Sequence, residues 1–375
     1  MRRLLLLAGT LACPAAAQSP LRAEIPACEA NGAVPSHEDL DAASARGLAW
    51  LAARQLPCGA WTGIVGHKRN DDYLELPRAL PVGDQRKAGH GHMGVTALCG
   101  MAFLAGGHLP DRGRYRQVVH KALSFILDHA EENGYLTDSG TRMYGHAFAT
   151  LFLAEACGSV PDPRLKQALE RAVDLIVDSQ NALGGWRYNA FDRELDLSVT
   201  VCQLQALRSA RNIGIRVPDG TIERALAYVR RSRVDQGPHR GRFYYKIHGR
   251  GAYQKDSEFA INAAALTALA CAGVYDEDLH DPALDFLENA YGEVADYYGE
   301  HFYFWYGNYY ACQAFFQRGG PRFARYYGRL CRDVLDSQQK DGRWRNSVGP
   351  GDEFSTAMAC ILLQVDKQLL PIFQR

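Results

Sequence analysis

The stretch Gln180-Asn-Ala-Leu-Gly184-Gly-Trp186 indicates a fold built from repeats. Its spacing, Gln-x-x-x-Gly-x-Trp, recurs at 55–61 and 338–344. Each copy follows an amphipathic helical pattern, such as the one over 165–179. We expect the glycine to end that helix in the left-handed conformation of a C-terminal cap. The tryptophan should then pack the turn against the next element. Three equivalent matches indicate an internal repeat.

A second repeat lies between these turns. Six Ala/Leu-rich helical segments start roughly 46 to 62 residues apart, at 96, 146, 200, 262, 308 and 356. More charged, amphipathic segments alternate with them, over 40–55, 115–130, 165–180, 221–233, 282–294 and 323–338. Apolar helices need to be surrounded, and amphipathic helices need an apolar surface to cover. The pattern therefore predicts an all-α (α/α)6 toroid, with six parallel inner helices inside six outer ones. An open solenoid is the alternative, but it would need polar caps at both ends.

The N-terminus has the pattern of a secretory signal peptide. Arg2 and Arg3 precede an apolar run over 4–12, and Ala15-Ala16-Ala17 offers a small-residue cleavage site. We expect a signal peptide over 1–17, an N-terminal extension over 18–38 and the toroid over 39–375. The mature chain is then expected to be exported, either periplasmic or secreted.

Charge and cysteine content narrow the function classes. The 375-residue chain has 42 basic and 42 acidic residues, so nothing favours nucleic acid as a partner. Nine of its ten cysteines follow residue 17, and none forms a CxxC pair. Cys28 and Cys58 lie outside the apolar segments and are the predicted disulfide partners. His67, His90 and His92 lack a nearby carboxylate at ligand spacing, so we predict no metal and no cofactor.

The turns, together with Asp196-Leu-Ser-Val-Thr200 and the following Ala206-Leu207, resemble the squalene cyclase and prenyltransferase repeat family. The resemblance covers the chain from about residue 42 to 365 and is strongest to members with a single toroid. It implies a terpenoid-cyclase-like toroid that encloses an aromatic cavity for isoprenoid chains.

This chain departs from the family at the catalytic acid. Squalene cyclases carry Asp-x-Asp-Asp-Thr, and its central Asp protonates the polyene. Alignment on Thr200 places Asp196 on the first Asp, Ser198 on the central one and Val199 on the third. A serine hydroxyl holds its proton too tightly to protonate an alkene. The Asp-x-Cys pair that would help bind the zinc of protein prenyltransferases is also missing from the sequence.

Aligning the six inner segments predicts which residues share a depth in the barrel. We expect five polar residues to meet at one mouth as a catalytic set: Arg142, His146, Asp196, Glu258 and Asp352. The predicted cavity lining is Thr96, Tyr144, Ser198, Thr200, Asn262, Phe304, Tyr306 and Asn308. The alternative is that these acids cap helix N-termini, where carboxylates are favoured for helix stability alone.

Three functions remain open at this stage. The first is binding or modification of an apolar, isoprenoid-like ligand. The second is an exported carbohydrate-active enzyme, either a glycosidase with Asp196 and Glu258 or Asp352 as its acid/base pair, or a polysaccharide lyase that uses Arg142 with Tyr144 or His146. The third is a non-catalytic scaffold for a protein partner. Association with a membrane surface also stays open, as does the oligomeric state.

Overall fold

The computed structural model describes residues 34–63, 67–69, 72–74, 91–138, 141–160, 162–247, 253–254, 258–296, 303–346 and 350–373. These residues contain twelve α-helices, two short antiparallel strand pairs and two 3-10 helices. The strand pairs join β1 (His67–Arg69) to β2 (Asp72–Leu74), and β3 (Lys246–Ile247) to β4 (Tyr253–Gln254). The predicted signal peptide and Cys28 lie outside the described residues.

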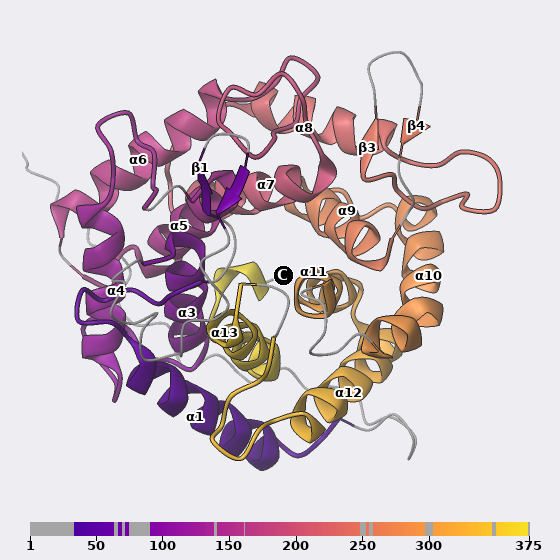
Figure 1. Cartoon of the computed structure of the whole chain (residues 1–375). Helices are drawn as coiled ribbons and strands as arrows, with labels where there is room; N and C mark the ends of the chain where they lie inside the picture. Colours follow the sequence, from indigo (N-terminus) through magenta and orange to yellow (C-terminus); the bar gives the residue numbers. More distant parts are fainter. Residues whose placement is uncertain are drawn as a thin grey trace, which may run out of the picture.

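The helices form two concentric rings, as Figure 1 shows in a view along the axis. The inner ring comprises α3 (Met93–Ala105), α5 (Met143–Ala156), α7 (Leu197–Asn212), α9 (Phe259–Cys271), α11 (Tyr303–Arg318) and α13 (Asp352–Leu363). The outer ring comprises α1 (His37–Arg54), α4 (Arg116–Asp128), α6 (Pro163–Asp178), α8 (Asp219–Arg231), α10 (Glu277–Asp296) and α12 (Gly320–Asp336). Each inner helix follows an outer helix along the chain, so the inner helices run in one direction. The predicted (α/α)6 toroid is confirmed.

Burial explains the two classes of helix. Every residue of α9 from Phe259 to Ala270 is buried, because α9 has neighbours on all sides. In contrast, α12 buries one apolar face that includes Phe323 and Tyr327, and it presents its arginines outward. None of the described helices is both long and apolar enough to span a bilayer.

The repeat turns attach each hairpin to the next. In the second copy, Trp186 is buried and its indole N–H donates to the Ile176 carbonyl at 2.7 Å. The Gln180 side-chain amide donates to the Gly184 carbonyl within its own turn and to the Thr221 carbonyl at the start of α8, both at 2.9 Å. One amide group therefore fixes the turn and the neighbouring outer helix together.

The same contact closes the ring. Gln338, in the last turn, donates to the Ala43 carbonyl of α1 at 2.9 Å. Glu353 of α13 pairs with Arg54, at the end of α1, at 2.6 Å. Helices α1 and α12 accordingly lie side by side in Figure 1. These first-to-last contacts exclude the open solenoid.

The predicted role of the repeat glycine needs a correction. The outer helices end at Arg54, Asp178 and Asp336, so the glycines lie beyond the helix ends and do not cap them. Gly184 does have a left-handed φ of 101°. A Cβ added there would lie 2.1 Å from the Arg224 carbonyl oxygen. The glycine is required because the backbone of the next outer helix passes directly against it.

Two further turns of this kind have no tryptophan, and the sequence comparison missed them. Gly134 and Gly241 also have positive φ, and an added Cβ would lie 2.2 Å from the Arg171 carbonyl oxygen and 2.6 Å from the Pro282 Cβ, respectively. Leu136 and Phe243 follow these glycines at the tryptophan position and are fully buried.

Cys58 carries an exposed free thiol in the structure. Its predicted partner, Cys28, lies outside the described residues, so the pairing stays a prediction.

We predict that Gly184→Ala destabilises the protein more than Gly158→Ala. Both glycines have positive φ, but an added Cβ at Gly158 meets nothing within 4 Å. Gly158→Ala should lower the free energy of unfolding by about 1–2 kcal/mol through backbone strain alone. Gly184→Ala should lower the free energy of unfolding by about 1–3 kcal/mol more than Gly158→Ala does, because two packed backbones must separate. Urea unfolding measures both values, and equal losses would contradict the close-approach role.

Candidate functional site

One set of predicted cavity residues faces the outer ring and not the axis. The Thr96 and Thr200 hydroxyls accept the backbone N–H groups of Trp61 and Trp186 at 3.0 and 3.2 Å. The Asn262 Oδ1 accepts from the Phe243 N–H in the same way at 3.0 Å. These side chains hold the repeat turns onto the inner helices.

Two other predicted lining residues are also structural. Asn308 accepts a hydrogen bond from the Tyr326 hydroxyl of α12, so it faces the outer ring as well. Phe304 is fully buried and packs edge-on against Trp305. The structure therefore places Thr96, Thr200, Asn262, Phe304 and Asn308 in the protein's own packing, since each of them is buried.

His146 has the same structural role. Its Nδ1 accepts from the Leu136 N–H at 3.1 Å, and its Nε2 lies 3.1 Å from the Ala172 carbonyl, to which it donates. Burial lowers the pKa of the imidazole to about 4, although the Ala172 carbonyl opposes this shift. This imidazole is fully buried and neutral, with both nitrogens bonded to backbone, so it serves the fold and lies apart from the bonded groups around Asp196.

The predicted carboxylates make separate contacts. Asp352 accepts from the Asn346 N–H at 2.8 Å and lies 3.4 Å from Arg343, both within its own repeat. Glu258 is the N-cap residue of α9, and its side chain makes no capping bond. Within the described part of the chain, no hydrogen bond or ion pair joins Asp196, Glu258 and Asp352. The side chain of Arg142 does not cap α5 and is half-buried at its start.

Asp196 is the centre of a polar network where the inner helices begin, an end we call the N-terminal mouth. Its Oδ1 accepts from the Val199 N–H at 2.9 Å, which caps α7, and from the Ser198 hydroxyl at 2.6 Å. Its Oδ2 pairs with Arg187. Tyr144, from α5, donates to the Ser198 hydroxyl at 2.5 Å. The structure thus brings together Asp196, Ser198 and Tyr144 from the predicted set.

Two loops add aromatic groups that the sequence analysis missed. The Arg187 guanidinium lies 4.2 Å from the Tyr188 ring centre and donates to the Tyr245 hydroxyl at 3.2 Å. The Tyr188 and Tyr245 hydroxyls are 2.9 Å apart, and the Tyr188 ring lies 6.0 Å from that of Tyr144. Tyr144, Tyr188 and Tyr245 are half-buried. The only sequence signal for Arg187 and Tyr188 was their place directly after a repeat turn.

Below the mouth, side chains fill the barrel axis. Tyr306 donates to the Ser198 carbonyl at 3.0 Å, and the Tyr310 hydroxyl lies 3.0 Å from the Cys202 sulfur. Both pairs connect α11 to α7 across the axis with a separation of 108 residues, the length of two repeats. Tyr309 and Tyr310 are fully buried. Tyr306, a predicted lining residue, therefore forms the floor of the mouth.

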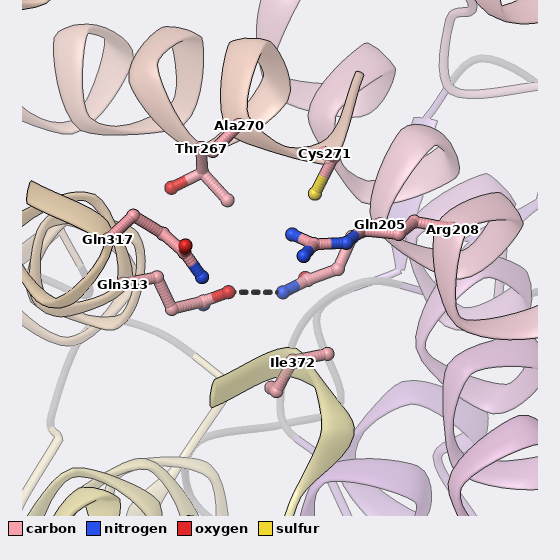
Figure 2. Close-up of a pocket in the computed structure, with 8 residues that line it drawn as sticks. All are labelled: Gln205, Arg208, Thr267, Ala270, Cys271, Gln313, Gln317 and Ile372. Atoms are coloured by element: carbon pink, nitrogen blue, oxygen red, sulfur yellow. Dashed lines mark hydrogen bonds between the residues drawn. The ribbon is translucent and has the colours of Figure 1, made fainter. Parts of the chain in front are cut away.

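The chain's own C-terminus closes the opposite end. The 3-10 helix η2 (Pro371–Phe373) contacts α7 and α11 near the axis of the ring (Figure 1). Ile372 lies against a small cavity of about 10 Å³, room for about one water molecule (Figure 2). Gln205 and Gln313 are hydrogen-bonded across this cavity at 2.5 Å. It is too small for an organic ligand.

Hydrogen bonds engage both oxygens of the carboxylate at the centre of the mouth. Asp196 accepts from Val199, Ser198 and Arg187. Burial, and then the neighbouring Tyr306, Asp196, Cys202 and Tyr188, raise the pKa of Tyr144 well above its ordinary value. Burial would lower the pKa of Arg187, but Asp196 and Tyr245 raise it above its ordinary value. The arrangement suits the binding of a ligand by aromatic faces and fixed hydroxyls better than it suits the protonation of a substrate.

The fold is an (α/α)6 helical toroid, an architecture that solved terpene cyclases and carbohydrate-active enzymes share. No protein-family model matches the sequence, and no curated protein matches it. Among solved structures, the chain is similar to the type II terpene cyclase MstE from Scytonema, with a TM-score of 0.55, 15% identity, and coverage of 90% of this chain and 100% of that chain.

Carbohydrate-active enzymes share the same fold. An α-1,6-mannanase, GH76A of Salegentibacter sp., in complex with α-1,6-mannotriose gives a TM-score of 0.60 at 10% identity, covering 88% and 99% of the two chains. The cellobiose 2-epimerase from Spirochaeta thermophila gives 0.62 at 13% identity, covering 88% and 97%. Identities this low show the fold alone.

We predict that protonation of His146 lowers the stability of the folded protein in acid. Its folded-state pKa of about 4 lies below the unfolded value of 6.5. Between these values the unfolded chain binds a proton that the folded chain does not, so stability falls as pH falls from about 6.5 to 4. The loss should approach about 3 kcal/mol and level off below pH 4.

His146→Asn should retain the acceptor for the Leu136 N–H, as Asn262 does for Phe243 in a later repeat. This variant should lose that pH-dependent part of the unfolding free energy. Urea titrations from pH 4 to 7.5 measure it. The same pH slope in variant and wild type would show that His146 is not the sensor.

Proposed function

We propose that this protein binds an apolar, isoprenoid-like ligand at the N-terminal mouth of its inner barrel and does not cyclise it. The observation that carries the proposal is the set of half-buried tyrosine rings around Ser198, from Tyr144, Tyr188 and Tyr245. Aromatic rings offer large apolar faces, while their hydroxyls stay fixed by hydrogen bonds. The terpene cyclase with the same fold supports this ligand class.

The ligand is proposed to lie across the mouth and not along the axis. Tyr306, Tyr309 and Tyr310 occupy the axis below Ser198, and cross-barrel hydrogen bonds hold Tyr306 and Tyr310. An apolar chain can therefore cover the exposed edges of the rings without displacing the core. This geometry favours binding over the enclosure that a cyclisation needs.

The carbohydrate-enzyme alternative has less support from the described residues. A glycosidase needs two carboxyl groups that face each other across the scissile bond. Asp196 is buried in an ion pair with Arg187, and Asp352 is bonded within its own repeat. For the lyase alternative, either Tyr144 or His146 was the predicted base, and His146 is bonded to backbone on both nitrogens, so only Tyr144 remains for that role.

Wild-type protein incubated with squalene should yield no polycyclic product. Ser198 replaces the protonating acid, its hydroxyl donates to Asp196, and neither group can supply a proton to an alkene. Gas chromatography with mass spectrometry of the extracted products measures the outcome. A polycyclic triterpene formed by wild type and absent without protein would refute the loss of cyclase chemistry.

Tyr144→Ala should weaken the binding of geranylgeraniol about 10-fold, because it removes an aromatic contact of about 1–1.5 kcal/mol. Tyr144→Phe keeps the ring and loses the hydroxyl that donates to Ser198, so its affinity should stay near that of wild type. Isothermal titration calorimetry measures these dissociation constants.

Tyr275→Ala is the matched control, since Tyr275 is an exposed tyrosine beyond the C-terminal end of α9. Its removal should leave binding unchanged. Equal losses for Tyr144→Ala and Tyr275→Ala, or saturable binding that survives Tyr144→Ala unchanged, would place the ligand elsewhere.

We also propose that the mature protein acts outside the cytoplasm, on the evidence of the signal-peptide pattern over 1–17. The intact mass of protein recovered from the exported fraction should correspond to a chain that begins at Gln18. An uncleaved mass there would argue against the proposed cleavage after Ala17.

A further inference from the structure

Glu194 bridges two cations at the rim of the N-terminal mouth. Its Oε2 lies 2.7 Å from the Lys246 Nζ and 3.7 Å from the Arg187 Nε. Lys246 belongs to β3, while Arg187 follows the Trp186 turn, so the two cations come from different repeats. One carboxylate oxygen thus occupies the position between them.

The anion is far more exposed than the cations that it bridges. The Glu194 side chain is 60% exposed, whereas Lys246 is 15% and Arg187 is 20% exposed. The two cations are therefore packed within the protein, whereas the carboxylate belongs to an exposed loop residue. The Glu194 carboxylate can turn into water, because most of its side chain is already exposed.

Arg187 is oriented in advance for a ligand. Asp196 and Tyr245 both bind its Nη1, and its guanidinium stacks on the Tyr188 ring. These contacts fix the guanidinium plane without using the Nε that faces Glu194. A second carboxylate arriving at this edge would find both cations in place, beside the tyrosine rings.

We infer that the ligand of this mouth carries a carboxylate group, which binds between Arg187 and Lys246 by displacing the Glu194 carboxylate. The inference rests on the proposed function for the apolar part of the ligand and adds its polar end. Glu194 is then an internal competitor that holds the site until the ligand arrives. The same carboxylate chemistry is found in an isoprenoid acid and in a uronic acid sugar.

The test compares geranylgeranoic acid with geranylgeraniol by calorimetry. Wild type should bind the acid at least about 10-fold more tightly, since a charge-assisted hydrogen bond contributes about 1.5–3 kcal/mol. Glu194→Gln removes the competitor, so it should tighten binding of the acid several-fold and leave the alcohol unchanged. Lys246→Met should abolish the advantage of the acid, and Lys246→Arg should restore most of it.

Glu170→Gln is the matched control. Glu170 is half-exposed and lies 3.8 Å from Lys166 on the outer helix α6, so it changes the net charge equally but away from the mouth. It should leave both affinities unchanged. A gain equal to that of Glu194→Gln would show a general charge effect and overturn the inference, as would equal affinity of wild type for acid and alcohol.

Sodium glucuronate, which has a carboxylate and no apolar tail, separates the two proposals. If acid and alcohol bind equally, the apolar proposal stands and the carboxylate inference fails. If neither binds, but glucuronate binds and Glu194→Gln tightens it, the carboxylate site stands and the isoprenoid proposal fails. If no probe binds saturably, both are wrong.

Discussion

A single side-chain amide in each complete repeat turn connects one helical hairpin to the next. Gln55, Gln180 and Gln338 each donate to the carbonyl of the glycine in their own turn and to a carbonyl of the following outer helix, at 2.8–2.9 Å. The bond from Gln338 returns to α1, so the interaction that propagates the repeat also closes it. Each of these amides is half-buried, so the loss of either partner would leave polar groups poorly satisfied.

This attachment also positions the mouth. The turn that contains Trp186 is held to α7 by Thr200, and the chain leaving that turn carries Arg187 and Tyr188 back over the start of α7. Asp196 caps α7 and pairs with Arg187, so one carboxylate stabilises the helix and orients the guanidinium. The site is therefore an extension of a structural contact, completed by Tyr144 and Tyr245 from the neighbouring repeats.

The sequence predicted the rings of helices because the periodic signals were long and repeated. It aligned residues that make equivalent contacts in different repeats, such as Thr96 and Thr200, but it did not predict which way their side chains point. Successive helical residues differ by about 100°, so Ser198 faces the axis while Thr200, two residues later, faces the outer ring. His146 occupies the same register as Thr200 and has the same role, although its side chain suggested chemistry.

Other features had no sequence signal strong enough to find them. Leu136 and Phe243 replace tryptophan in two turns, which hid those copies from the spacing comparison. The C-terminal segment that contains Ile372 and Phe373 is too short to show periodicity, yet it closes one end of the barrel. Arg187 and Lys246 are brought together by loops from different repeats, and such contacts depend on the three-dimensional path of the chain.

The central claim is that this toroid retains a ligand at its N-terminal mouth without converting it. The most direct measurement is mass spectrometry of organic extracts from protein purified under native conditions, with Tyr144→Ala purified in parallel. The account predicts an unmodified isoprenoid-like compound at near-equimolar amounts in wild type and a much smaller amount in the variant. Wild-type protein that carries no such compound, or equal amounts in both proteins, would contradict it.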